Sequence, residues 1–152
     1  MKQLGFTRIM KPLDEPCYSD TVTVWDKPGG IAISKEFHAR TWPNPFRPND
    51  HESYLKAYGA IVPGAYPGKC DAHHILYHKC ILINGGGEIP CLWPNTNHGG
   101  RAVLTETFVH RGSADNWSGS KGCLTIAPSD ADEFFALFAD GEEVQIEIKT
   151  LG

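Results

Sequence analysis

The most constraining feature of this sequence is a set of short segments in which apolar and polar residues alternate. Residues 21–25 (Thr-Val-Thr-Val-Trp) and 144–148 (Val-Gln-Ile-Glu-Ile) have a period of two, which is typical of strands that bury one face. Turn-forming stretches such as Asp-Lys-Pro-Gly-Gly at 26–30 separate such segments, and the chain contains 16 glycines and 11 prolines. We therefore predict a fold built mainly of strands joined by turns.

One segment has a convincing helical pattern. Ser129 is a suitable N-cap, acidic residues follow it in the first turn, and a run of phenylalanines forms an apolar face. Asp140-Gly141 is typical of a helix end. We predict one packed helix near residues 129–139 within a single domain that spans residues 1–152. The predicted fold class is mainly β (β-rich α+β), a compact sandwich or barrel.

Composition and charge exclude some classes of partner. The formal net charge is −4 at pH 7 and the sequence has no basic stripe, which argues against binding to nucleic acid. No stretch reaches the length of a membrane span, so we expect no membrane insertion. We expect a monomer that needs no cofactor.

The segment 107–128 holds the residues that most resemble a reactive site. A short apolar run ends in His110, a loop of small and polar residues follows, and Cys123 opens a second apolar run. A thiol becomes a useful nucleophile when an adjacent imidazole or positive charge lowers its pKa, and His110, Arg111 and Lys121 all lie close to Cys123 in sequence. Glycines and serines between the two let the backbone turn so that amides face a developing oxyanion. The imidazole would be oriented by a backbone carbonyl or by Asp115 or Asn116. In a structural role, His110 and Cys123 would instead be buried strand residues.

This segment resembles the catalytic signature of L,D-transpeptidases of the YkuD type, in the short form of peptidoglycan-targeting relatives. The resemblance lies in Val109-His110-x-Gly112 and Ser120-x-Gly122-Cys123-Leu124. It implies a YkuD-like fold without a cofactor, in which Cys123 attacks a carbonyl of a peptidoglycan stem peptide and forms a thioester with His110 as base. Ser120 would be the first residue of the second box, and Gly122 and Cys123 would contribute amides to the oxyanion hole. The thioester would pass to an amine (transpeptidation) or to water (carboxypeptidase or endopeptidase action).

Three departures from the family pattern concern the acceptor and the substrate preference more than the acyl chemistry. The gap between His110 and Cys123 is shorter than in the standard enzymes. Lys121 stands where those enzymes usually have a second histidine, and Thr125 stands where an arginine or asparagine is common. Stem peptides carry carboxylates, which Arg101, Arg111 or Lys121 would bind by charge-assisted hydrogen bonds. We expect these cations and Gly112 to contact substrate.

Two other functions fit parts of the sequence. His73, His74 and His78 lie close enough to suggest a metal-dependent hydrolase. The local sequence 73–83 is rich in strand formers, however, and a single strand would divide these histidines between two faces, so we predict no metal site. The second alternative is a non-catalytic β-rich module of a phage particle or secretion system.

Cysteine usage and the N-terminus suggest a compartment. The sequence contains five cysteines: Cys17, Cys70, Cys80, Cys91 and Cys123. Their odd number leaves at least one thiol unpaired, and no pair of them has zinc-ribbon spacing. The first residues lack the apolar core of a signal peptide, so we expect synthesis in the cytoplasm. Action on the cell wall in the periplasm would then require another system for delivery. The protein would be a toxin or effector with a delivery or immunity protein as partner.

Overall fold

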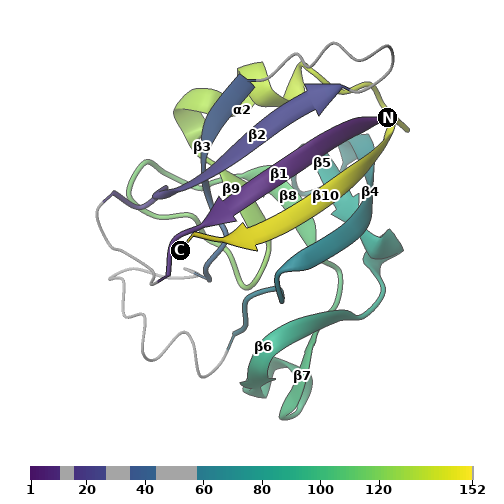
Figure 1. The fold of residues 1–152 in the computed structure, drawn as a ribbon. Coiled ribbons are helices and arrows are strands. Elements are labelled where there is room, and N and C mark those ends of the chain that lie inside the picture. Colours follow the sequence, from purple (N-terminus) through teal and green to yellow (C-terminus); the bar gives the residue numbers. More distant parts are fainter. Residues whose placement is uncertain (11–15, 27–34, 44–57, 152) are drawn as a thin grey trace.

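The computed structural model describes residues 1–10, 16–26, 35–43 and 58–151 (Figure 1). Strands make up 54% of the described residues and helices 11%, which confirms the prediction of a mainly β fold with a packed helix near residues 129–139. Among the described residues, eight strands form a closed barrel in the order β1-β10-β4-β5-β8-β9-β3-β2. Their bounds are β1 Lys2–Arg8, β2 Asp20–Asp26, β3 Lys35–Arg40, β4 Gly64–His74, β5 His78–Ile83, β8 Phe108–Arg111, β9 Leu124–Ile126 and β10 Glu143–Thr150.

The two alternating segments form neighbouring parts of the barrel wall, on either side of β1. β1 pairs antiparallel with β2 and parallel with β10, so the first and last strands of the chain lie side by side (Figure 1). The apolar residues of these strands face the barrel interior and are at most 4% exposed: Leu4, Phe6, Val22, Val24, Val144, Ile146 and Ile148. The predicted strands at 21–25 and 144–148 are therefore confirmed as parts of β2 and β10.

The helix α2 (Pro128–Phe135) packs beside β3 and β9. Phe134 is fully buried, and its ring meets that of Phe37 edge to face, with the centroids 5.4 Å apart. The N-cap is Ala127, with Pro128 at the first helical position, so the expected N-cap Ser129 is wrong by two residues. Proline suits this position because its missing N–H would have no partner there. The α-helix also ends before residue 139, and a turn follows it.

Two predicted strands are interrupted. The segment 73–83 turns at Ile75–Tyr77, so β4 and β5 form a hairpin in which His74 pairs with His78. The residues before His110, from Arg101 to Val109, are also predicted from the sequence to form one strand, but this strand breaks where Glu106 adopts a φ of 49°. β7 (Arg101–Leu104) therefore joins β6 (Ile89–Asn95) in a separate two-stranded sheet, whereas β8 joins the barrel. Short 3₁₀ turns, η2 (Asn84–Gly86) and η3 (Thr96–His98), lie at the two ends of β6.

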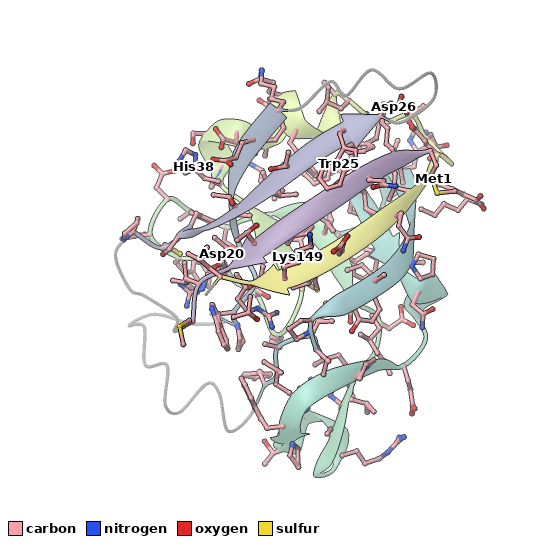
Figure 2. The ribbon with its side chains drawn as sticks, in the orientation of Figure 1. Met1, Asp20, Trp25, Asp26, His38 and Lys149 are labelled. Carbon is pink, nitrogen blue, oxygen red and sulfur yellow. The ribbon has the colours of Figure 1, made fainter. Side chains whose placement is uncertain are left out.

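Buried polar side chains hold one end of the barrel together. Asp20, at the start of β2, accepts hydrogen bonds from the backbone amides of Ile9 and Thr41, both at 2.7 Å (Figure 2). The Thr41 hydroxyl donates to Asp20 at 2.8 Å and accepts from Arg8 Nε at 2.7 Å. Arg8 also donates to the carbonyl of Ile61. Burial raises the pKa of Asp20 and lowers the pKa of Arg8 to about 10.

No helix in the described ranges is both long enough and apolar enough to span a membrane.

Candidate active site

β8 and β9 bring the two predicted reactive residues together. These strands are adjacent and parallel, with Val109 opposite Leu124. His110 lies within β8, and Cys123 comes directly before β9. The two side chains line one cavity of about 330 Å³. The predicted strand before the imidazole and the predicted strand after the thiol are both present. Because these strands pair, His110 and Cys123 reach the same cavity although a loop separates them in sequence.

His110 is held in a defined orientation. It is 4% exposed, and its Nδ1 lies 2.7 Å from the carbonyl oxygen of Arg111. A carbonyl can only accept, so Nδ1 carries the proton and Nε2 is the basic nitrogen. Of the orienting groups considered from sequence, the backbone carbonyl is the one in contact, whereas Asp115 and Asn116 line a different cavity.

The pKa of His110 is lowered from its ordinary value, chiefly because burial disfavours the charged ring. Proximity to His74 lowers this pKa further, and the hydrogen bond to the Arg111 carbonyl raises it in part. The imidazole is therefore neutral near pH 7, the state in which it can accept a proton.

Cys123 is the most accessible of the cysteines. All five are free thiols; four are buried and Cys123 is partly exposed. Its Sγ accepts a hydrogen bond from the backbone amide of Phe108 at 3.4 Å. Burial raises the pKa of Cys123 to about 11, and the backbone hydrogen bonds lower it by less.

A neutral thiol and a neutral imidazole that line one cavity differ from the lowered thiol pKa that the basic neighbours His110, Arg111 and Lys121 suggest from the sequence. The physical reason is desolvation of the sulfur, which is the largest influence on this pKa. One of the basic neighbours, Arg111, pairs with Asp132 of α2 at 3.1 Å. The thiol and the imidazole suit general-base catalysis, in which the proton leaves the sulfur during attack, rather than a preformed thiolate.

Ser120 and Gly122 shape the turn into Cys123. The buried Ser120 hydroxyl donates to the carbonyl of Cys123 at 2.6 Å and accepts from the amide of Gly122 at 3.1 Å. Gly122 has a φ of 134°, and a Cβ there would lie 3.1 Å from Leu104 and 3.2 Å from the carbonyl of Gly59. Glycine is thus required for both the conformation and the space. Because the Gly122 amide already has a partner in the turn, the Cys123 amide is the better candidate oxyanion donor.

The four predicted substrate-binding residues lie in different places. Lys121 lines the cavity, and its Nζ is 5.9 Å from the ring centroid of Tyr58. Arg111 lines a neighbouring cavity of about 420 Å³ next to Asp132. Arg101 lies in β7 and pairs with Glu88 at 2.7 Å. Gly112 donates its amide to Ile126, and a Cβ there would collide with the hydroxyl of Tyr18.

Three further residues of the cavity lining were not singled out from sequence: Tyr77, His98 and Glu106. His98 lies in η3, with Nδ1 3.0 Å from Asn95 Oδ1 and Nε2 3.2 Å from Thr105 Oγ1. Glu106 comes from the break between β7 and β8. Nearby turn-forming residues were the only local sequence feature that could have indicated these three residues, because all three lie in connections between strands.

The histidines of the metal hypothesis lie on the β4–β5 hairpin. His74 Nδ1 accepts hydrogen bonds from the amides of Leu76 and Tyr77, at 3.1 and 3.2 Å. His73 Nε2 lies 3.9 Å from Asp140. Across the described ranges, no group of three or more His, Cys, Asp or Glu side chains is placed to hold a metal ion.

Of three comparisons with known proteins, only the one with solved structures found a similarity. No family model matches the sequence, and no curated protein matches it. Among solved structures, it is similar to an L,D-transpeptidase (Yku) from Stackebrandtia nassauensis, at 20% identity and a TM-score of 0.40, over 94% of this chain and 54% of that one. It is also similar to L,D-transpeptidase 1 from Mycobacterium tuberculosis, at 12% identity and a TM-score of 0.37, over 97% of this chain and 63% of that one. The chain thus spans between half and two thirds of these structures, and at such scores the likeness does not place it in their family.

Proposed function

We propose that this protein transfers acyl groups of peptidoglycan stem peptides through Cys123, with His110 as the base. The observation that carries the proposal is the shared cavity of these two residues. There, the Arg111 carbonyl fixes the proton of His110 on Nδ1 and leaves Nε2 to act as the base. The resemblance of the surrounding boxes to the L,D-transpeptidase signature supports this choice of substrate.

The proposed reaction needs no charge on either group at rest. The Cys123 sulfur attacks a peptide carbonyl while its proton passes to His110 Nε2. The Cys123 amide stabilises the tetrahedral oxyanion. When the intermediate collapses, the C–N bond breaks, His110 returns the proton to the leaving amine, and a thioester remains on Cys123.

The thioester is then broken by the same steps in reverse order. An amine or a water molecule attacks the thioester carbonyl and gives a proton to His110. The C–S bond breaks, and the thiol of Cys123 is restored with that proton. An amine acceptor gives a new peptide bond, whereas water gives a free carboxylate. The same two residues serve both outcomes.

Lys121 is the residue proposed to recognise the substrate's charge. Its side chain belongs to the cavity that contains Cys123, whereas Arg111 lines the neighbouring cavity and Arg101 lies in β7. A carboxylate of the stem peptide would accept hydrogen bonds from the Lys121 ammonium.

Mass spectrometry of purified muropeptides tests the proposal. We expect wild-type protein to release an amine fragment from the stem peptide and to add either water or a supplied amine. Cys123→Ala and His110→Ala should each lower the rate by roughly 10³-fold or more. Cys70→Ala removes a buried thiol outside the cavity and should keep the activity. Unchanged muropeptides with folded wild-type protein, or full turnover in Cys123→Ala that a chelator abolishes, would contradict the proposal.

A further inference from the structure

Tyr77 lies flat against His110 on the side of the imidazole that the β4–β5 turn covers. The two ring centroids are 4.2 Å apart and the planes differ by 9°. This is a stacked contact, in which the flat tyrosine ring limits the tilt of the imidazole ring. Tyr77 lines the same cavity as His110 and Cys123. It also lines the neighbouring cavity next to Arg111, so its ring stands between the two spaces.

The turn that carries Tyr77 is itself held by a histidine. His74 ends β4, and its Nδ1 accepts hydrogen bonds from the amides of Leu76 and Tyr77. The His74 ring also stacks on Tyr77, with centroids 5.1 Å apart and planes 15° apart. Tyr77 is thus stacked on two imidazoles, those of His74 and His110.

A third ring supports this stack from the strand that bears His110. Phe108 meets His74 at 4.8 Å and Tyr77 at 5.2 Å between centroids. Phe108 and His110 both lie in β8, and the Phe108 amide donates to the Cys123 sulfur. The stack therefore connects the tip of one hairpin to both proposed reactive residues.

Burial of apolar surface during folding does not explain the conformation of this turn. Its other two residues, Ile75 and Leu76, are 89% and 72% exposed, so the turn buries little apolar surface of its own. Its aromatic residue nevertheless makes ordered contacts with three rings. A turn that contributes so little to the core, yet covers a buried imidazole, is better explained by its effect on that imidazole.

We propose that Tyr77 is a positioning residue for His110 and that His74 holds Tyr77 in place. The tyrosine ring confines the imidazole to the plane in which Nδ1 meets the Arg111 carbonyl, and it shields that hydrogen bond from water. Nε2 is thereby kept as the basic nitrogen. The effect on turnover rests on the proposed function, whereas the effect on the imidazole does not.

Nitrogen-15 NMR of the His110 side chain tests the positioning directly. The spectra are recorded on Cys123→Ala protein, because the tautomer of His110 can be measured in a protein without activity. Against that background, Tyr77→Phe keeps the ring and Tyr77→Leu removes it. We expect Tyr77→Phe to retain the Nδ1-protonated form. Tyr77→Leu should populate both tautomers and move the His110 titration up toward the ordinary histidine value, because the ring that excludes water is gone.

His74→Phe separates stacking from hydrogen bonding. It keeps an aromatic ring beside Tyr77 and removes the acceptor for the Leu76 and Tyr77 amides. We expect an intermediate shift in the His110 tautomer, since the turn loosens while the stack is retained. Circular dichroism confirms that each variant is folded, and Tyr77→Met replaces the leucine variant if that one unfolds.

Turnover measurements with Cys123 present complete the test. Tyr77→Leu should lower kcat by roughly 10-fold to 100-fold with little change in KM, and its acid limb should move to higher pH. Tyr77→Phe should remain within about 3-fold of wild type. An unchanged His110 tautomer and titration in folded Tyr77→Leu would overturn the inference, as would equal damage from Phe and Leu. A shifted tautomer in a protein without any peptidoglycan activity would refute the proposed function and leave the positioning role intact.

Discussion

At the scale of single residues, the central feature is a thiol and an imidazole that are both neutral at rest. Burial raises the pKa of Cys123 and lowers that of His110, so each shift moves the group away from its charged form. A preformed thiolate–imidazolium pair would need the opposite shifts. The proposed acyl transfer would therefore depend on moving the proton during attack, and the orientation of His110 would matter more to it than the local charge.

The raised pKa of Cys123 predicts how its alkylation depends on pH. Because the thiolate is the reactive form, labelling by iodoacetamide should keep rising from pH 7 to pH 10 and approach its plateau near the pKa of about 11. Mass spectrometry of peptides from each labelled cysteine measures these rates. The four buried thiols should label more slowly at every pH. A plateau for Cys123 between pH 5 and 7, as a positive neighbourhood would produce, would contradict this account.

The lowered pKa of His110 predicts the acid limb of turnover. The base is active when unprotonated, and protonation requires a pH below its depressed folded-state value. Consequently kcat/KM should stay constant down to the ordinary histidine value near pH 6.5 and fall only below it. A pH–rate profile with stem peptide as substrate measures this limb. An acid limb centred above pH 6.5 would show that burial does not control His110.

At the scale of elements, the site depends on the turn that leads into β9 and on its contact with β7. Leu104 of β7 packs close to Gly122, so the small two-stranded sheet forms one side of the cavity. The positive φ of Gly122 and the Ser120 hydrogen bonds then set the direction in which Cys123 leaves the turn.

Gly122→Ala tests this arrangement against Gly141→Ala. Both glycines have positive φ, but a Cβ at Gly141 meets nothing within 4 Å. Gly141→Ala should cost about 1 kcal/mol of unfolding free energy for the backbone conformation alone. Gly122→Ala should cost roughly 2–4 kcal/mol and abolish turnover, because Leu104 or the Gly59 carbonyl must also shift. Chemical denaturation compares the two, and equal costs would mean that the space around Gly122 is not restricted.

Sequence patterns predicted the elements better than their ends. The period of two at 21–25 and 144–148 gave two barrel strands, because one face of each packs inside. The turn at Ile75–Tyr77 and the break at Glu106 escaped prediction, since both make contacts with residues distant in sequence. Tyr77 stacks on His110, and the Glu106 amide donates to the carbonyl of Gly86. Likewise, the sequence predicted His110 and Cys123 as a pair. It did not predict Tyr77, because its role depends on a stack between strands that are distant in sequence.

At the scale of the whole molecule, the barrel is closed by hydrogen bonding at one end as well as by its apolar interior. Asp20 joins the start of β2 to the segments that follow β1 and β3, through three accepted hydrogen bonds. Asp26 lies at the other end of β2 (Figure 2). There it is 4.0 Å from the N-terminal amine, with a side chain 37% exposed.

Replacing each aspartate by alanine therefore gives a matched pair. Asp20→Ala leaves buried amides without acceptors and should lower the unfolding free energy by roughly 3 kcal/mol. Asp26→Ala removes a 4.0 Å ion pair between partly exposed groups and should cost less than about 1 kcal/mol. Urea unfolding at pH 7 measures both. Similar costs for the two variants would show that the Asp20 network does not stabilise the closed barrel.

The most direct test of the central claim is to trap the acyl group on the protein. Intact-mass spectrometry after brief mixing with a purified stem tetrapeptide should show an added mass equal to the acyl fragment, mapped to the peptide that contains Cys123 and lost when an amine is added. The adduct should be absent from Cys123→Ala and present in Cys70→Ala. An adduct on a different residue, or product formation by Cys123→Ala at the wild-type rate, would contradict the account.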